Sequence, residues 1–327
     1  MTRSTRNDDA HGRRIDYLRL SVTDRCSLRC IYCMPESGVP LVSHHEILSF
    51  EEVWRVAASA RRLGFTKFRI TGGEPLEVRN VLELIRGVRR AIDTATLGLT
   101  TNGLRLVELA LALRDAGVER LNVSLDALDP ACFKAMTRRD GVSRVLAGID
   151  RALEVGFTRL KVNAVIVPGV NEDEIVALAG LALNRPIDVR FIEQMPLSGA
   201  ANRQFLGASE IIRRINEVYP LAPVTPEDPR QAAQQMFRSP ALVGLIGLVA
   251  PRSRKFCHAC NRLRLTSKGE LKGCLLAANT LDVRKPLRDQ VSDAALDDLL
   301  ARAIGLKPLE SGDEGPGVGA SMRVIGG

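Results

Sequence analysis

Hydrophobic and polar residues follow two alternating rhythms along the first 193 residues of the chain. Short β-rich runs end in small or polar residues, and each is followed by a longer stretch with apolar residues at helical spacing. The predicted strands are Ile15–Val22, Thr66–Thr71, Thr96–Thr101, Arg120–Ser124, Arg159–Val167 and Ile187–Ile192. The predicted helices lie near 49–63, 79–93, 105–116, 142–155 and 171–183. Gly64, Gly117 and Gly156 fit the position just past a helix end.

Six strand–helix repeats predict an α/β fold with a parallel sheet and helices outside it. A closed barrel of this kind has eight repeats, so we expect an incomplete (βα)6 TIM-type barrel, with an open doubly wound sheet as the alternative. After about residue 196 the rhythm changes. A proline-rich stretch at 219–230 predicts a loop, short β-type runs dominate from Met236 to Cys274, and a last helix is expected at 292–304.

These changes in rhythm divide the chain into four expected parts. The parts are a flexible N-terminus (1–14), a partial barrel (15–230), a β-rich C-terminal region (231–309) and a mobile tail (310–327). Tails of this kind, rich in glycine and acidic residues, are usually poorly ordered.

Composition and charge narrow the class of protein. The chain has 327 residues, of which 45% are hydrophobic and 26% charged, as in a globular protein and unlike a disordered one. The longest apolar run, Ala241–Ala250, is half of the roughly 20 residues that cross a bilayer, and Met1–Arg14 does not resemble a signal peptide. We therefore expect a cytoplasmic protein. The net charge of +8 suits nucleic acid or an anionic small molecule, and composition does not decide between them.

Polar residues gather at the ends of four of the predicted strands and just after them. They are Thr71–Glu74, Thr100–Asn102, Ser124–Asp126 and Arg190–Glu193. Because the carboxyl ends of parallel strands face the active site in such folds, this repetition predicts a site at that edge of the sheet.

Six of the seven cysteines form two groups of three, and an odd count argues against a disulfide framework. The first group is Cys26, Cys30 and Cys33, immediately after the first strand. Structural zinc usually takes four ligands, and a four-iron cluster normally takes four cysteines. Three thiolates would leave one iron with an open position that can bind a substrate. The remaining cysteine, Cys132, reads as a small apolar residue.

The second group is Cys257, Cys260 and Cys274. One interpretation is a zinc knuckle with His258 as fourth ligand, although His258 lies between the two cysteines and is poorly placed to share their metal. The other is a second cluster with an open iron. Strand alternation after Cys260 puts Arg262 and Arg264 on one face, where they could hold an anionic or base-bearing ligand.

The spacing C-x3-C-x2-C with Tyr32 before its last cysteine, followed by Gly72-Gly73-Glu74-Pro75, resembles the radical S-adenosylmethionine (SAM) superfamily. The resemblance implies that an open iron chelates SAM and that one electron cleaves it to a 5′-deoxyadenosyl radical. Further motifs stand in order: Leu18–Cys26, Arg69–Pro75, Leu99–Gly103, Asn122–Asp126, Lys161–Asn163, Arg190–Glu193, Cys257–Arg264 and the final Ile325-Gly326-Gly327. Together they resemble the GTP 3′,8-cyclase family of molybdenum cofactor biosynthesis.

That resemblance implies a reaction. Hydrogen would be taken from ribose C3′ of GTP, and the carbon radical would add to purine C8, giving (8S)-3′,8-cyclo-7,8-dihydroguanosine 5′-triphosphate, a lyase-type step. It implies two [4Fe–4S] clusters and SAM as cofactors, and a C-terminal β-rich extension that carries the second cluster.

The residue roles implied by the resemblance fall into four groups. The metal ligands would be Cys26, Cys30, Cys33, Cys257, Cys260 and Cys274, and SAM would be bound by Tyr32, Gly73, Ser124 and Met195. GTP would be bound by Arg19, Arg69, Thr100, Lys161, Arg262, Leu263 and Arg264. Catalysis would be supported by Gly326 and Gly327.

The resemblance also implies partners. They are a flavodoxin- or ferredoxin-type electron donor and a downstream cyclic pyranopterin monophosphate synthase, with no nucleic acid and no membrane, in a monomer or homodimer. Two alternatives remain: a peptide-modifying radical SAM enzyme with an auxiliary cluster, and a zinc- or nucleic-acid-binding module without enzymatic activity.

Overall fold

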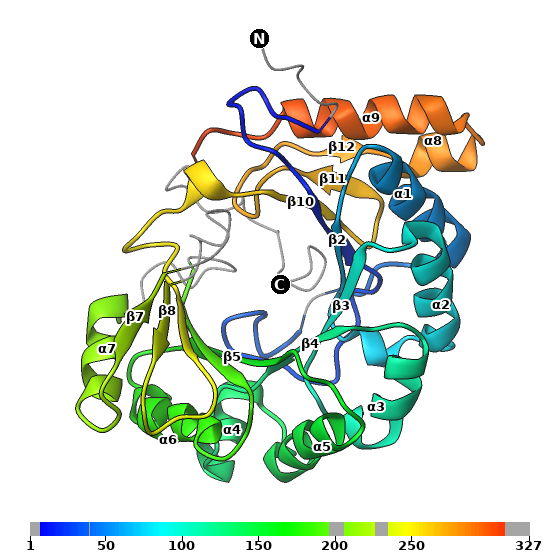
Figure 1. Cartoon of the computed structure of the whole chain (residues 1–327). Coiled ribbons are helices and arrows are strands. Elements are labelled where there is room, and N and C mark those ends of the chain that lie inside the picture. Colours follow the sequence, from blue (N-terminus) through cyan, green and yellow to red (C-terminus); the bar gives the residue numbers. More distant parts are fainter. Residues whose placement is uncertain (1–6, 39, 196–205, 226–234, 311–327) are drawn as a thin grey trace.

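The computed structural model describes residues 7–38, 40–195, 206–225 and 235–310. Within these ranges 12 strands form one mixed sheet that curves around a central space, with helices on its outer side (Figure 1). The strand order is β12-β11-β10-β1-β2-β3-β4-β5-β6-β9-β8-β7, an open series whose two end strands have one neighbour each. None of the helices in these ranges has the length and apolar character that a bilayer crossing requires.

Six parallel strands form the centre of the sheet and match the six predicted ones. They are β1 (Tyr17–Ser21), β2 (Lys67–Thr71), β3 (Thr96–Thr101), β4 (Arg120–Ser124), β5 (Leu160–Ile166) and β6 (Asp188–Glu193). Each pairs in parallel with the next. The helices between them are α1 (Phe50–Arg62), α2 (Val81–Ile92), α3 (Leu106–Asp115), α4 (Pro130–Thr137), α5 (Val142–Glu154) and α6 (Ile175–Ala179). This arrangement is that of a partial TIM-type barrel.

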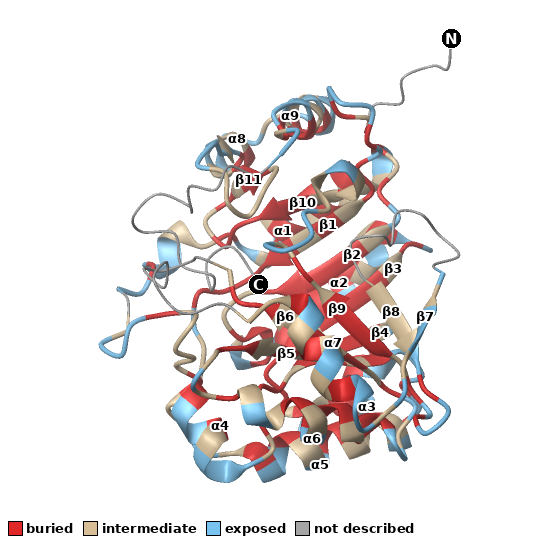
Figure 2. Ribbon diagram, turned by 90° about the vertical axis from the view of Figure 1, so that its left-hand side faces the viewer, coloured by how far each residue is buried: buried red, intermediate tan, exposed pale blue. Residues whose placement is uncertain are grey.

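Helix α1 shows how local sequence produces these elements. The Ser49 side chain accepts a hydrogen bond from the Glu52 amide at 3.3 Å, and the Glu52 carboxylate accepts one from the Ser49 amide at 2.7 Å. This capping box satisfies amides that the first turn leaves unpaired. Val53, Val56 and Ala57 follow at helical spacing and are buried against the sheet, whose central strands are largely coloured as buried in Figure 2.

Helix ends agree with the glycine prediction, and one predicted helix is divided. Gly64, Gly117 and Gly156 each follow a helix with φ between +93° and +95°, a conformation that glycine adopts without a Cβ penalty. The predicted helix at 171–183 is instead a 3-10 turn, the short α6 and a second 3-10 turn. Helix α4 was not predicted; it follows the capping residue Asp129, whose carboxylate accepts a hydrogen bond from the Cys132 amide at 2.8 Å.

The C-terminal strands do not form a separate layer. They are β7 (Ala222–Val224), β8 (Gln235–Arg238), β9 (Ile246–Val249), β10 (Arg262–Leu265), β11 (Glu270–Lys272) and β12 (Leu281–Asp282). β10 pairs in parallel with β1 and β9 in parallel with β6, so the expected extension is divided between both edges of the barrel sheet. The reason is that a six-stranded arc leaves two edges with unpaired amide and carbonyl groups.

The proline-rich stretch predicted to be a loop contains β7, which pairs antiparallel with β8 at the end of the sheet. An end strand tolerates Pro223 because one of its sides needs no amide donor. Helix α7 (Ala208–Asn216), ahead of β7, was not predicted either.

Two further helices, α8 (Arg284–Arg288) and α9 (Asp293–Gly305), lie beside α1 at one edge of the barrel (Figure 1). α9 confirms the predicted last helix. Asp297 of α9 accepts hydrogen bonds from Ser59 at 2.6 Å and from Arg62 at 2.7 Å, both on α1. The C-terminal part of the described chain is therefore fastened to the barrel.

The N-terminal segment also packs against that part. A buried ion pair joins Arg13 to Asp9 at 2.6 Å, and the Arg13 guanidinium donates to the Pro308 carbonyl at 2.6 Å and the Cys257 carbonyl at 2.7 Å. Residues 7–14, within the stretch predicted to be flexible, thus make specific contacts with the C-terminal region.

Candidate active site

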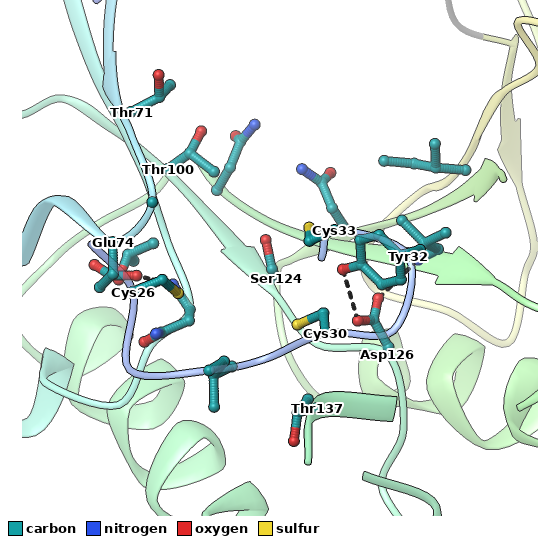
Figure 3. A pocket seen from close by; sticks show the side chains of 18 of the residues that line it. Cys26, Cys30, Tyr32, Cys33, Thr71, Glu74, Thr100, Ser124, Asp126 and Thr137 are labelled. Carbon is teal, nitrogen blue, oxygen red and sulfur yellow. Dashed lines mark hydrogen bonds between the residues drawn. The ribbon is translucent and has the colours of Figure 1, made fainter. Parts of the chain in front are cut away.

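The first cysteine triad lies in a loop that begins after β1, at the carboxyl edge of the parallel strands. The amides of Arg29 and Ile31 donate to the carbonyls of Thr137 and Met136 at 2.9 and 3.0 Å, which fixes the loop to the end of α4. The three cysteines line one cavity of about 230 Å³ (Figure 3). Spacing and tertiary contacts therefore bring all three thiols to a common space, as the sequence predicted.

Two thiols of this triad, those of Cys26 and Cys30, are poor acids on their own. Burial raises the pKa of Cys26 to about 12, and a hydrogen bond with Cys33 together with burial raises the pKa of Cys30 well above its usual range. A thiolate is the form that binds metal, and a bound cation lowers a thiol pKa strongly. Cys26 and Cys30 therefore favour the thiolate form only when a cationic centre is bound.

The glycines after β2 approach the chain just before the triad without room for a side chain. A Cβ on Gly73 would lie 2.2 Å from the Arg25 carbonyl oxygen, and one on Gly72 would lie 2.7 Å from the Thr23 carbonyl oxygen. The Gly73 amide donates to the Thr23 carbonyl at 2.7 Å. Glycine is needed because backbone meets backbone.

Glu74 fastens the ends of two strands and does not present a free carboxylate to the cavity. It is buried and accepts hydrogen bonds from the Thr101 hydroxyl at 2.8 Å, the Asn102 amide at 2.6 Å and the Leu76 amide at 3.0 Å. Burial raises its pKa to about 7 against the lowering effect of these donors. Its role in this structure is to hold β2 and β3 in position beside the triad.

The remaining predicted SAM-binding residues also line the cavity: Tyr32, Ser124 and Met195. The Tyr32 hydroxyl donates to Asp126 at 2.9 Å, and Asp126 also accepts from the Val165 amide at 2.8 Å (Figure 3). Burial raises the pKa of Asp126 to about 6. Asp126 belongs to the polar strand ends that predicted a site at this edge, but the sequence predicted no individual role for it, because its contact with Tyr32 depends on the fold.

A second cavity of about 200 Å³ lies inside the barrel next to the first. Arg19, Asn122, Asn163 and Ile192 line both cavities, so the two adjoin. Basic side chains project into the second from six strands. They are Arg19, Lys67, Arg69, Arg120, Lys161, Arg190 and Arg262.

These cations are held close together with little carboxylate nearby. Lys161 pairs with Asp188 at 2.7 Å, whereas Arg69 donates to the Tyr17 hydroxyl at 2.7 Å. The Nε atoms of Arg120 and Arg190 are buried and make no hydrogen bond to the described part of the chain. Burial lowers the pKa of Arg190 to about 10, which leaves it charged at neutral pH. Such a cavity is chemically suited to a polyanion.

The phenol of Tyr17, which also lines this cavity, is affected by the same positive charges. Burial alone would raise the pKa of Tyr17, but the charges of Arg69, Arg19 and Arg262 outweigh it and lower the pKa to about 7. Arg264 is 6% exposed, and the sheet register places it beside Arg19 on β1. Burial lowers the pKa of Arg264 to about 10.

The second triad lies at the opposite end of β1 from the first. β10 runs parallel to β1, and Cys257 and Cys260 precede β10, whereas the first triad follows β1. Cys274 follows β11, which is antiparallel to β10, so it returns to the same end. Five strand residues rising about 3.3 Å each separate the two ends by roughly 16 Å. The cation-lined cavity lies between them.

Two predicted residues differ from the expectation, and two cannot be placed. The Leu263 side chain is fully buried in the hydrophobic core, so only its main chain is available to a ligand. Thr100 lines the cavity of the first triad and not the cation-lined one. Gly326 and Gly327 lie outside the described residues.

Tyr17, Lys67 and Arg120 also line the second cavity without having been predicted to, and Arg190, predicted only as part of a polar strand end, lines it too. The signal was present: polar side chains alternate along strands whose other positions are apolar, as in Lys67 and Arg69 on β2. Buried parallel strands are usually apolar on both faces, so this alternation marks a polar interior.

The arrangement of the thiols is compatible with a four-iron cluster. Across the described ranges, no three His, Cys, Asp or Glu side chains are placed to hold one metal ion. One tetrahedral zinc with Zn–S bonds of about 2.3 Å would bring its sulfurs within about 4 Å of each other. A four-iron cluster binds each thiolate through a different iron, so its ligands stand further apart. Three thiols around one cavity fit that requirement.

Comparison with known proteins agrees with this site. A family model described as "Radical SAM superfamily" matches residues 20–182, and one described as "Molybdenum Cofactor Synthesis C" matches residues 187–312. A "GTP 3',8-cyclase" of Moorella thermoacetica is 43% identical over 92% of this chain and 94% of that protein. The chain belongs to the GTP 3′,8-cyclase family.

Other members of the GTP 3′,8-cyclase family show similar agreement. The "GTP 3',8-cyclase" of Peptoclostridium acidaminophilum is 41% identical over 98% of both chains. "Molybdenum cofactor biosynthesis protein 1" of Drosophila melanogaster is 39% identical over 94% of this chain and 55% of that protein. The chain is therefore a radical SAM enzyme, whose family binds a [4Fe–4S] cluster and SAM.

Among solved structures, Streptococcus suis SuiB bound to precursor peptide SuiA has a TM-score of 0.50 and 18% identity, covering 63% of this chain and 46% of that one. At this identity the similarity concerns the barrel fold and not the reaction. The relatives in the GTP 3′,8-cyclase family favour the cyclase over the peptide-modifying alternative.

Proposed function

We propose that the protein converts GTP to (8S)-3′,8-cyclo-7,8-dihydroguanosine 5′-triphosphate, the first step of molybdenum cofactor biosynthesis. The observation that carries this proposal is the cation-lined cavity inside the barrel, bounded by a cysteine triad at each end. A nucleoside triphosphate inside the barrel can present its triphosphate to the cations and its base to the second triad, with the adjoining ribose open to the cavity of the first triad.

At the carboxyl end of the strands, Cys26, Cys30 and Cys33 would hold a [4Fe–4S] cluster with one open iron. Gly73 and Tyr32 line the space beside it and would bind SAM, with Ser124 and Met195 completing the wall. When bound, these cofactors supply the 5′-deoxyadenosyl radical that takes hydrogen from ribose C3′. Asp126 positions Tyr32 through its hydrogen bond, and Glu74 keeps the glycine segment against the triad loop.

Inside the barrel, the cations would bind the triphosphate of GTP. Arg19, Arg69 and Lys161 project from β1, β2 and β5, and Arg190 has a buried nitrogen that a phosphate oxygen would satisfy. Guanidinium groups bind phosphate oxygens in a two-pronged geometry, which fixes orientation as well as charge. The bound substrate would thus have its reacting atoms already in a productive orientation.

At the opposite end, Cys257, Cys260 and Cys274 would hold a second cluster, whose open iron would face the guanine. Arg262 and Arg264 continue from this triad along β10 into the barrel. The Arg262 guanidinium lies 5.7 Å from the centre of the Phe256 ring, which helps to fix its direction. These residues would connect the base-binding end with the phosphate-binding cavity.

The partners follow from the chemistry. Reducing a cluster of this kind needs a low-potential electron donor of the flavodoxin or ferredoxin type. The cyclised nucleotide must be consumed by a further enzyme, for which we propose cyclic pyranopterin monophosphate synthase. Six cluster-binding thiols must stay reduced, so we place the protein in the cytoplasm, as a monomer or homodimer.

An anaerobic experiment with two triple variants tests the proposal. The reconstituted protein is incubated with GTP, SAM and dithionite, and 5′-deoxyadenosine and cyclised nucleotide are quantified by mass spectrometry. Changing Cys26, Cys30 and Cys33 to Ser should abolish both products. Changing Cys257, Cys260 and Cys274 to Ser should abolish the cyclised nucleotide while some SAM cleavage remains.

Two outcomes would contradict the proposal. If the first variant still forms 5′-deoxyadenosine, the first triad is not the radical-generating site. If the wild-type protein cleaves SAM but leaves GTP unchanged, the substrate assignment is wrong, and a peptide-modifying enzyme becomes the better interpretation.

A further inference from the structure

Lys307, just beyond the end of α9, is a buried cation that the proposed reaction does not use. Lys307 is 3% exposed, and its ammonium group makes three hydrogen bonds. It donates to the Cys260 sulfur at 3.3 Å, to the Arg262 carbonyl at 2.9 Å and to the Gly273 carbonyl at 2.6 Å. An ammonium has three donors, so all of them are satisfied.

These three acceptors come from the two arms of the second triad. Cys260 and Arg262 belong to the arm that leads into β10, and Gly273 directly precedes Cys274 on the arm that leaves β11. Lys307 therefore bridges the two arms at the point where their cysteines must converge.

The buried charge of Lys307 needs a compensating anion. Within the described residues no carboxylate lies within 4.0 Å of its ammonium, whereas Arg13 nearby is paired with Asp9. A buried ammonium without an opposite charge is costly. Among the groups that the Lys307 ammonium contacts, the Cys260 sulfur can carry a negative charge. It carries that charge as a thiolate bound to a cluster.

The backbone is shaped to admit this lysine. A Cβ on Gly273 would lie 2.9 Å from the Lys307 Cα, so a larger residue at 273 would displace the chain that carries the ammonium. On the other side, α9 is fastened to α1 of the barrel through Asp297. Lys307 is thus held from a rigid helix against the triad.

We propose that Lys307 is a positioning residue for the C-terminal cluster, holding the two arms of the triad together and placing a positive charge against the Cys260 sulfur. The inference rests on the proposed second cluster. A cationic donor to a ligating sulfur stabilises the reduced form of the cluster, which carries one more negative charge, and so raises its reduction potential.

The test uses full-length protein with Cys26, Cys30 and Cys33 changed to Ser, so that only the C-terminal cluster is present. Iron content and the midpoint potential from an EPR-monitored titration are measured anaerobically. In this background, Lys307→Met should give a more negative midpoint potential, or lose iron while the melting temperature shows a folded chain. Lys307→Arg keeps the charge and should stay closer to the parent protein.

Two more variants keep the test decisive. Gly273→Ala retains the lysine but pushes it away, so the midpoint potential of the cluster in this variant should also become more negative. If Lys307→Met does not fold, the Gly273→Ala variant decides the test. Lys285→Met, on the exposed surface of α8, removes the same charge away from the triad and should change neither quantity.

An unchanged midpoint potential and full iron content in both Lys307→Met and Gly273→Ala would overturn the role of Lys307 while leaving the second cluster in place. A parent background that binds no iron would overturn the second cluster itself, and the role of Lys307 with it.

Discussion

Replacing Gly73 with alanine tests the close contact on which the first triad depends. The new Cβ would lie 2.2 Å from the Arg25 carbonyl oxygen and 2.6 Å from its carbon. Because these are backbone atoms, no side-chain rotation relieves the clash. The loop that leads into Cys26 must move instead.

The magnitude can be worked from the contacts. Two backbone hydrogen bonds are at risk, from the Gly73 amide to Thr23 and from the Glu74 amide to Arg25, each 2.7 Å long. At about 0.5–1.5 kcal/mol each, with overpacking at about 1–3 kcal/mol, the penalty is about 2–6 kcal/mol. A domain whose free energy of unfolding is about 5–15 kcal/mol can remain folded despite this penalty if only the triad loop changes conformation.

The expected result is a folded protein without its first cluster. Iron in the anaerobically reconstituted protein should fall from about eight to about four per chain, and 5′-deoxyadenosine formation should be lost. The control is Gly305→Ala, since a Cβ at Gly305 meets nothing within 4 Å and its φ is not positive. That variant should be neutral or slightly more stable. If Gly73→Ala retained about eight irons and cleaved SAM at the wild-type rate, the close contact would not matter.

Three further predictions concern substrate binding and turnover. Arg264→Ala should weaken GTP binding by roughly ten- to a hundredfold, the loss of one charged hydrogen bond worth about 1.5–3 kcal/mol, with both clusters intact; unchanged affinity in anaerobic equilibrium dialysis would argue against this arginine. The pKa of Tyr17 is lowered to about 7, so above that pH its side chain is an anion that opposes phosphate binding. GTP affinity should therefore fall between pH 6 and 8 more steeply in the wild type than in Tyr17→Phe. Equal slopes of affinity against pH in the two proteins would contradict this. Deleting Gly326 and Gly327 should leave folding, clusters and GTP binding near normal but remove most cyclised product by mass spectrometry, and full activity would show that the two glycines are dispensable.

Much of the barrel could be predicted from local sequence. The strand and helix periodicities of 15–193 identified six repeats, and the capping box at Ser49 and Glu52 marks a helix start by itself. The first triad could also be predicted from the sequence, because its three cysteines lie within eight residues at the end of one strand. Such features depend on contacts between neighbours in the chain, which the order of residues specifies directly.

The edges of the sheet were decided by the tertiary structure. Periodicity indicated β-type runs after Met236, but it did not say that β9 joins one edge of the barrel and β10 the other. Such pairing depends on which open edge a strand can reach and hydrogen-bond, and residues more than 200 positions apart take part in it.

The composite site has the same origin. The sequence by itself determined which chemical groups are present: two triads, a set of arginines and a glycine segment. Only the parallel pairing of β10 with β1 placed the triads at opposite ends of the barrel and Arg264 beside Arg19. Likewise, only the docking of α9 on α1 brought Lys307 to Cys260. The physical reason is that a spacing pattern records local geometry, whereas convergence of distant residues depends on how the sheet curves and which faces pack.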